Sequence, residues 1–425
     1  MLNQGHPLES WYRDSVSEPP RFAALDRDLR IDVAIIGGGF TGLGAALELA
    51  QKGVRVAVLE GADIGSGASG RNGGQIHTGQ RIDPETLAQT VGGDAARQLW
   101  DMAEDAKAGL RGLIDTHAID CDLRSGLLHV WHKPAFEAED RSYIDFARSH
   151  YRYDKVSILD KQRVSQELGT DVYYGGTFDA GGGHLNPLKL ALGLATAAVQ
   201  AGALLFEHTR VTRIDTSGAK PLVHTAKGIV TCDNVLVCGN GYMEGLDERI
   251  DSHVMPINNF ILATEPLPDN SVLPNDYAAA DSRFVVNYWR KTPDNRLLFG
   301  GGENYTPWFP KDIKAFVRRN MLKIYPQLAD VKITHGWGGT LAITMNRAPF
   351  VRRLSPNVVV SAGYSGQGVV LAPYFGKLLA RAVTGDSRDI DLLSQLPVPA
   401  FFGGKTLRWP ALVAGLSYYA LRDRL

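Results

Sequence analysis

The chain has 425 residues, enough for about two domains, and its 44% hydrophobic and 21% charged residues are ordinary for a soluble globular protein. A formal net charge of -1 argues against a protein that attracts nucleic acid or an anionic membrane through its overall charge. The three cysteines form no C-x-x-C pair, so neither a metal site nor a disulfide framework is expected, and a reducing, cytoplasmic location fits.

The N-terminal part predicts a strand–helix–strand unit. Residues 31–36 form a short β-branched run typical of a buried parallel strand, residues 40–52 predict a helix, and residues 54–59 predict a second strand. Glycine spacing within this apolar stretch argues against a membrane span, and the first residues lack the basic and apolar segments of a secretory signal. A loop rich in Gly and Ser follows, from Gly61 to Gly79.

The rest of the chain alternates between two kinds of sequence pattern. The expected elements are a helix at 84–118, a strand at 126–131, and helices at 137–150 and 187–200. A strand at 204–214, two strands within 228–240, and strands at 253–265, 283–290 and 296–302 follow. The last elements are a helix at 311–325, and a strand, glycine turn and helix over 358–385. Strand–glycine–helix pieces predict an α/β, Rossmann-type dinucleotide-binding domain over 1–85, 155–250 and 340–400. The pieces between them, 86–154 and 251–339, predict an inserted α+β substrate domain with a largely antiparallel sheet, and 401–425 a helical tail.

A dinucleotide fingerprint stands between the first strand and helix. Gly37, Gly39 and Gly42 form G-x-G-x-x-G around Phe40 and Thr41, which suits a tight turn, close approach to a pyrophosphate and close helix packing. Glu60 ends the second strand, where a carboxylate can accept hydrogen bonds from ribose hydroxyls and would repel a 2′-phosphate. NAD and FAD both use this fingerprint, so the choice depends on the next segment.

The loop that follows favours FAD. It is long, polar and flexible, and comprises Ser66, Gly67, Ala68, Ser69, Gly70, Arg71, Asn72, Gly73, Gly74 and Gln75. The string from Glu60 to Gln75 resembles the flavin loop of the D-amino-acid-oxidase-like superfamily, whose members bind FAD with the flavin at the domain interface. Segments 10–15 (SWYRDS), 288–303 and 401–425 resemble the γ-glutamylputrescine oxidase branch, so the resemblance spans nearly the whole chain.

The resemblance also assigns further cofactor contacts. A second glycine turn before the last helix would place backbone N–H groups against the flavin through Gly363, Ser365, Gly366, Gln367, Gly368 and Val369. Val211 matches a position whose backbone contacts adenine, and Gly239 a turn near the dinucleotide. Gln367 stands where many relatives have His, which leaves any acid–base role of this position open. We expect noncovalent FAD, because Cys238 is the only cysteine in a flavin-facing segment.

The implied reaction is oxidation of the C–N bond of an amine. A neutral amine would pass a hydride to the flavin, the resulting imine would be hydrolysed to an aldehyde or keto acid, and oxygen would reoxidise the flavin and form hydrogen peroxide. Sarcosine-oxidase-like relatives carry a carboxylate-binding Lys where this chain has Val369 and Val370. This departure favours an amine with a remote carboxylate, such as γ-glutamylputrescine, unless Arg290, Lys291 or Arg347 reaches the carboxylate.

The candidate substrate pocket consists of residues in the segments expected around the flavin: Tyr288, Trp289, Trp337, Tyr364, Gln367 and His77. Core packing is an equal alternative for each aromatic residue, whereas for His77 a purely local role is favoured over substrate contact. Three other functions stay open: a glycine, sarcosine or D-amino-acid oxidase, a dehydrogenase that reduces a quinone, and an FAD-binding subunit of a larger complex.

Overall fold

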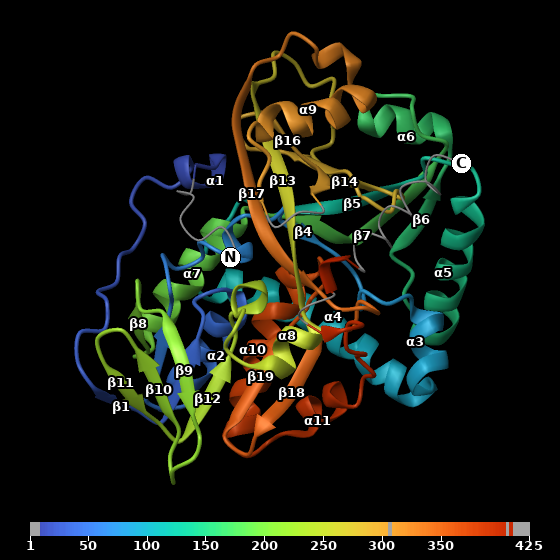
Figure 1. Ribbon diagram of the computed structural model, residues 1–425. Coiled ribbons are helices and arrows are strands. Elements are labelled where there is room, and N and C mark those ends of the chain that lie inside the picture. The colour runs from blue at the N-terminus through green and yellow to red at the C-terminus, as the bar shows by residue number, and fades with distance from the viewer. Residues whose placement is uncertain (1–8, 305–307, 405–407, 411–425) are drawn as a thin grey trace.

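The computed structural model describes residues 9–304, 308–404 and 408–410. In Figure 1 the lower half contains a six-stranded sheet with helices, and the upper half contains a nine-stranded sheet with α9 on its outer side. The expected combination of an α/β half with a largely antiparallel second half is therefore confirmed.

The six-stranded sheet is the core of the lower half. Its strands, in spatial order, are β18 (Phe350–Ser355), β19 (Val358–Ala362), β12 (Asn234–Val237), β2 (Val33–Ile36), β3 (Val56–Leu59) and β8 (Leu204–Phe206). Only the edge strand β18 is antiparallel to its neighbour. β2, β3 and β19 are buried at every residue, as their runs of Val, Ile and Ala predict for a parallel sheet covered on both faces.

Some of the helices and a small sheet surround this core, whereas α6 and α9 contact strands of the upper half. In chain order, the helices of the described chain are α1 (Trp11–Asp14), α2 (Phe40–Gln51), α3 (Pro84–Val91), α4 (Gly93–Thr116), α5 (Phe136–Tyr151), α6 (Lys161–Leu168), α7 (Pro187–Gln200), α8 (Glu248–His253), α9 (Ile313–Ile324), α10 (Gly368–Val383) and α11 (Arg388–Ser394). α2 packs against α7 and α10, and α4 packs against α10. The small sheet comprises β1 (Leu29–Arg30), β11 (Ile229–Thr231), β10 (Leu222–Thr225) and β9 (Val211–Asp215).

The nine-stranded sheet forms the upper half. Its strands, in spatial order, are β17 (Ile333–Ile343), β13 (Met255–Pro266), β16 (Arg296–Asn304), β15 (Tyr288–Lys291), β14 (Ala278–Asp281), β5 (Arg124–Val130), β7 (Gly176–His184) and β4 (Gln75–Ile76), and β6 (Val156–Leu159) also pairs with β7. The pairs are antiparallel except β14 with β5. One face of this sheet packs against α9 through its own hydrophobic cluster, which includes Trp289, Phe299 and Met321.

Three expected elements differ in the structure. The helix expected at 84–118 is two helices, because Gly92 adopts φ 83° and separates α3 from α4. The strand expected at 204–214 is β8 and β9, which join different sheets on either side of His208 at φ 49°. The strand expected at 283–290 is confined to β15.

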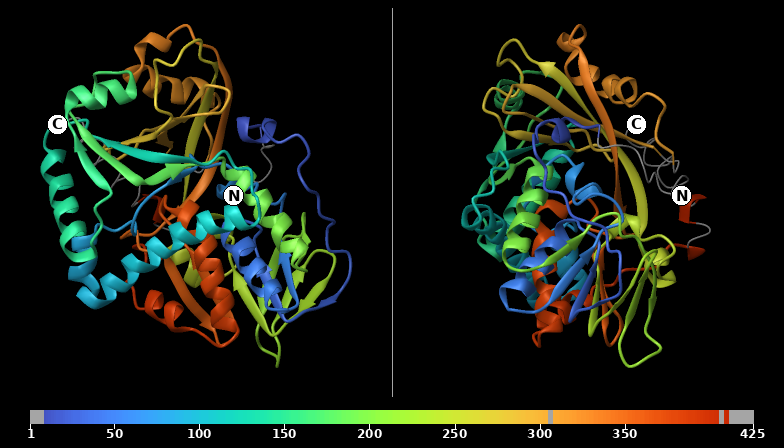
Figure 2. Two further views of the ribbon diagram at one scale, coloured as in Figure 1. Left: turned by 180° about the vertical axis from the view of Figure 1, so that it is seen from behind. Right: turned by 90° about the vertical axis from the view of Figure 1, so that its left-hand side faces the viewer.

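The halves also divide the chain differently from the expected segments. β6 and β7 belong to the nine-stranded sheet, although 155–250 was assigned to the dinucleotide-binding domain. α4 packs on α10 of the lower half, although 86–154 was assigned to the substrate domain, and in the view from behind it runs along the boundary between the halves (Figure 2). The alternation of sequence patterns along the chain does not reveal which sheet a strand joins, because sheet membership depends on hydrogen bonding between strands that are distant in the sequence.

The structure describes only part of the helical tail that was expected at 401–425. Residues 408–410 are helical, whereas 405–407 and 411–425 of the expected tail lie outside the described residues. Within the part of the chain that the structure describes, no helix is both long and apolar enough to cross a membrane.

Candidate active site

A cavity of about 1110 Å³ lies where the two halves meet. Its walls come from the segments that directly follow β2, β3 and β12, from the turn before α10, and from residues of β13, β15 and β17. The carboxyl ends of parallel strands are where doubly wound folds bind ligands. The volume exceeds the roughly 300–1,000 Å³ of most small-molecule pockets, so the cavity can hold a dinucleotide together with a substrate.

The first glycine turn has the geometry that the fingerprint predicts. Gly37 adopts φ 106°, in the region that favours glycine. Gly37, Gly39, Phe40 and Thr41 line the cavity. Gly42 does not, since it faces the turn itself: a Cβ atom on Gly42 would lie 2.0 Å from the carbonyl oxygen of Gly37. The N-terminus of α2 therefore lies at the cavity wall, where its N–H groups can bind phosphate.

Glu60 presents a carboxylate to the cavity directly after β3. Its Oε2 accepts a hydrogen bond from the Gly38 N–H at 2.7 Å and its Oε1 accepts one from the Ala62 N–H at 2.9 Å. Burial raises the pKa of Glu60, these backbone donors lower it, and the nearby charge of Glu207 raises it further. Each carboxylate oxygen keeps capacity for another donor, which is what two ribose hydroxyls need.

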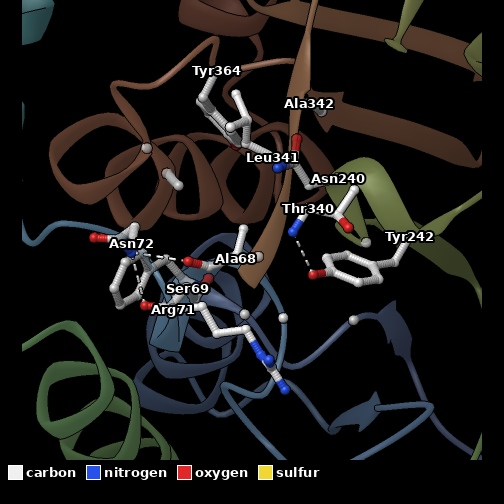
Figure 3. A pocket seen from close by; sticks show the side chains of 18 of the residues that line it. Ala68, Ser69, Arg71, Asn72, Asn240, Tyr242, Thr340, Leu341, Ala342 and Tyr364 are labelled. Atoms are coloured by element: carbon white, nitrogen blue, oxygen red, sulfur yellow. Dashed lines mark hydrogen bonds between the residues drawn. The ribbon is translucent and has the colours of Figure 1, made fainter. Parts of the chain in front are cut away.

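The loop after Glu60 is held in shape by its own polar side chains. Asn72 Nδ2 donates to the carbonyl oxygens of Ala68 and Ser69 at 2.9 and 3.0 Å (Figure 3), and Asn72 Oδ1 accepts from the Gly74 N–H at 2.7 Å. Ser69 Oγ accepts from the Phe40 N–H at 2.9 Å, which joins the loop to the first glycine turn. The expected cofactor residues of this loop all line the cavity: Gly67, Ala68, Ser69, Arg71, Asn72, Gly73, Gly74 and Gln75.

The second glycine turn places the N-terminus of α10 at the same cavity. Ser365, Gly366, Gln367, Gly368 and Val369 line it, with Ser365 and Gly366 in left-handed conformations at φ 52° and 103°. Gln367 Oε1 is buried and has no hydrogen-bond partner among the described residues, so it is available to a ligand. Helix N-termini stabilise negative charge, as a flavin ring requires when it accepts a hydride.

Two side chains connect the second turn to its surroundings. The Tyr364 hydroxyl hydrogen-bonds to Thr41 Oγ1 at 2.7 Å and to Ser361 Oγ at 2.8 Å, so it joins the two glycine turns. Gly363 does not line the cavity; its N–H donates to Asn240 Oδ1 at 2.9 Å behind the turn. Val211 and Gly239 line the cavity as well.

The opposite wall comes from the nine-stranded sheet and contains ionisable groups. Tyr288 and His77 line it, together with Arg81 and His129, which the sequence did not single out. Burial lowers the pKa of His77 to about 4, and the charges of Arg81 and His129 act in the same direction. His77 is therefore uncharged at neutral pH. Arg81 lies only six residues beyond Gln75, a proximity that could have suggested it.

Several expected pocket residues lie outside the cavity wall. Trp289 is buried in the core of the upper half and stacks on Phe299 with ring centroids 5.7 Å apart. Trp337 donates its indole N–H to the Arg71 carbonyl oxygen at 3.1 Å, on the outer side of the flavin loop. Arg290 and Lys291 do not line the cavity either, whereas Arg347 does. Tyr288 and Trp289 are adjacent in β15, so their side chains point to opposite faces of the sheet. Sequence alone does not reveal which of the two faces lines the cavity.

The residues present fit FAD. Two helix N-termini, the Glu60 carboxylate and an internally braced polar loop all open into one cavity. The unpartnered Gln367 Oε1 adds an acceptor beside the second turn. When bound, FAD supplies the acceptor for a hydride.

Comparison with known proteins identifies the family. The family model of FAD dependent oxidoreductases (DAO) matches residues 32–382. The chain is 45% identical over 98% of both chains to the probable oxidoreductase OrdL of Rhizobium meliloti (strain 1021), and 37% identical over 98% of both chains to the gamma-glutamylputrescine oxidoreductase of Escherichia coli (strain K12). Among solved structures, glycine oxidase from Geobacillus kaustophilus superposes with a TM-score of 0.73 at 23% identity, over 87% of this chain and 99% of that chain. The chain therefore belongs to the DAO family and is an FAD-dependent oxidoreductase.

Proposed function

We propose that this enzyme oxidises the C–N bond of an amine whose carboxylate, if present, lies far from the reacting carbon, with γ-glutamylputrescine or a similar γ-glutamyl polyamine as the best candidate. The observation that carries the proposal is the apolar start of α10. Val369 lines the cavity beside the second glycine turn, and Val370 is buried. An α-carboxylate placed against these residues would lose its hydration and gain no cation partner from them. This desolvation costs several kcal/mol.

The relative from Escherichia coli supports this substrate class. It is named gamma-glutamylputrescine oxidoreductase, and the match covers 98% of both chains. Such a substrate carries its α-carboxylate many bonds from the amine carbon that reacts. Arg81 and Arg347 also line the cavity, and in this proposal they supply positive charge for that carboxylate.

The chain's own residues bind and orient the amine. Tyr288 and Tyr364 give the cavity aromatic walls, which suit a flexible aliphatic chain and exclude water. His77 carries no charge at neutral pH, so it does not repel a cationic amine as it approaches. With FAD bound, the N–H groups at the start of α10 would stabilise negative charge on its ring. We assign no obligatory acid or base among these residues, and we expect FAD to be bound noncovalently because burial keeps the pKa of the Cys238 thiol above its usual range.

The test is anaerobic reduction of the bound flavin. Holoenzyme is mixed without oxygen with γ-glutamylputrescine, putrescine, sarcosine, glycine and D-alanine, and the loss of the visible absorbance of oxidised flavin is followed. Rapid bleaching by γ-glutamylputrescine and slow bleaching by the α-amino acids supports the proposal. Faster bleaching by sarcosine, glycine or D-alanine overturns it and indicates an amino-acid oxidase.

Oxygen is the electron acceptor that we propose, with hydrogen peroxide as its product. Mixing the reduced enzyme with oxygenated buffer should restore the flavin absorbance within the turnover time. Slow recovery in oxygen, together with fast recovery with a quinone, would contradict this part and indicate a dehydrogenase.

A further inference from the structure

Three buried side chains hold three consecutive carbonyl groups of the flavin loop. Trp337 Nε1 donates to the Arg71 oxygen at 3.1 Å, the Tyr12 hydroxyl to the Asn72 oxygen at 2.8 Å, and Arg290 Nε to the Gly73 oxygen at 2.9 Å. The donors come from β17, α1 and β15, which are far apart in the sequence. We name Tyr12, Arg290 and Trp337 the loop clamp.

The members of the loop clamp also contact one another. Arg290 Nη2 donates to the Tyr12 hydroxyl at 3.3 Å, and its guanidinium carbon lies 5.6 Å from the centre of the Tyr12 ring. The Tyr12 and Trp337 rings meet edge to face at 5.2 Å. Their exposed fractions are 0% for Tyr12, 2% for Arg290 and 3% for Trp337. Burial also raises the pKa of Tyr12, so its hydroxyl remains a donor at neutral pH.

The clamp fixes the direction of the N–H groups on the other side of the loop. All described peptide bonds are trans, so the N–H of each following residue points opposite to the carbonyl that the clamp holds. The N–H groups concerned belong to Asn72, Gly73 and Gly74, all of which line the cavity. The Gly74 N–H already donates to Asn72 Oδ1, whereas among the described residues the N–H groups of Asn72 and Gly73 have no hydrogen-bond partner. They are therefore available to the cofactor.

We propose that the loop clamp sets the position of the flavin loop's N–H groups, so that FAD binding and the docking of α1 stabilise each other. Tyr12, Arg290 and Trp337 are positioning residues, since they act on the cofactor only through the loop. Docking of α1 orders the loop before FAD binds, and bound FAD in turn holds the carbonyls against the clamp, because coupling between two binding events is reciprocal.

Conservative variants of the holoenzyme test this coupling without any substrate. Tyr12→Phe and Trp337→Phe each remove one donor and keep an aromatic ring. Tyr325→Phe is the matched control: Tyr325 is also 0% exposed and donates to a backbone carbonyl, that of Leu168 at 3.0 Å, but it lies outside the cavity wall. FAD release after dilution is measured by the rise in fluorescence of free flavin, and tryptic cleavage after Arg13 reports undocking of α1.

Loss of one hydrogen bond predicts FAD release about five- to tenfold faster in Tyr12→Phe and Trp337→Phe, and a change below about twofold in Tyr325→Phe. Tryptic cleavage after Arg13 should also be faster in Tyr12→Phe and should slow again when excess FAD is added. Faster cleavage with unchanged FAD release would overturn the proposal, because α1 would then only cover the core. Equal acceleration of FAD release in Tyr325→Phe would overturn it as well. Neither readout uses an amine, so failure here is distinct from failure of the proposed substrate.

Discussion

Replacement of Glu60 by Gln isolates what its charge contributes to FAD binding. The two carboxylate oxygens each accept one backbone N–H, from Gly38 and Ala62, and an amide can serve only one of them. The other N–H loses its partner, which costs about 1–3 kcal/mol of folding stability. Hydrogen bonds from ribose hydroxyls to a neutral amide are about half as strong as those to a carboxylate. A loss of about 1–1.4 kcal/mol predicts FAD release about five- to tenfold faster.

Glu207 provides a matched control. It follows β8 as Glu60 follows β3, it is 3% exposed, and its two oxygens accept the N–H groups of Phe22 and Ile64 at 3.0 and 2.8 Å. It does not line the cavity. Glu207→Gln should therefore lose similar stability in urea unfolding of the apoprotein, while FAD release from the holoenzyme stays unchanged.

The comparison of the two variants decides the matter. Removing the charge of Glu207 lowers the pKa of Glu60, so this control cannot weaken FAD binding by protonating Glu60. If Glu60→Gln releases FAD no faster than Glu207→Gln, the assignment of Glu60 to the ribose is wrong. In that case the carboxylate serves only to hold the backbone around Gly38.

Three further predictions concern the fold, the pH dependence and the substrate. Gly42→Ala should destabilise the protein by more than about 2 kcal/mol, since its Cβ would lie 2.0 Å from the Gly37 oxygen; an unchanged Tm would refute this. The folded-state pKa of His77, about 4, lies below its ordinary 6.5, so its contribution to stability is complete above pH 6.5 and is lost as the pH falls to 4. Over that range urea unfolding should show the wild-type apoprotein losing up to about 3 kcal/mol more than His77→Gln; parallel curves would contradict this. Val369→Lys should speed anaerobic flavin reduction by sarcosine at least about tenfold relative to that by γ-glutamylputrescine, because it supplies a cation for an α-carboxylate; an unchanged ratio would count against the substrate proposal.

The dinucleotide site could be predicted from the sequence because its parts are local. Gly37, Gly42 and Glu60 lie within one strand–helix–strand unit, and the glycine geometry of such a turn is a property of the backbone itself. The same holds for the second turn, where the string from Gly363 to Val369 lies between β19 and α10. The family and the cofactor followed from these motifs, and the comparisons confirm both.

The substrate side was predicted less well because it depends on which face of a strand meets the cavity. Tyr288 and Trp289 are neighbours in β15, yet Tyr288 lines the cavity and Trp289 packs into the upper core. Arg290 and Trp337 were candidates for substrate contact, and the structure places both on the outer side of the flavin loop. An alternating pattern predicts that a strand has two different faces, but it does not predict which face lines the cavity and which packs into the core.

The sequence by itself determined the cofactor, the family and the glycine turns, because short segments with fixed backbone requirements encode them. Only the tertiary structure decided which sheet β7 joins, that Arg81 and His129 reach the cavity, and that Tyr12 lies against a loop sixty residues away. These contacts join segments that are distant along the chain, and their partners are selected by the packing of the whole core and not by local conformational preference.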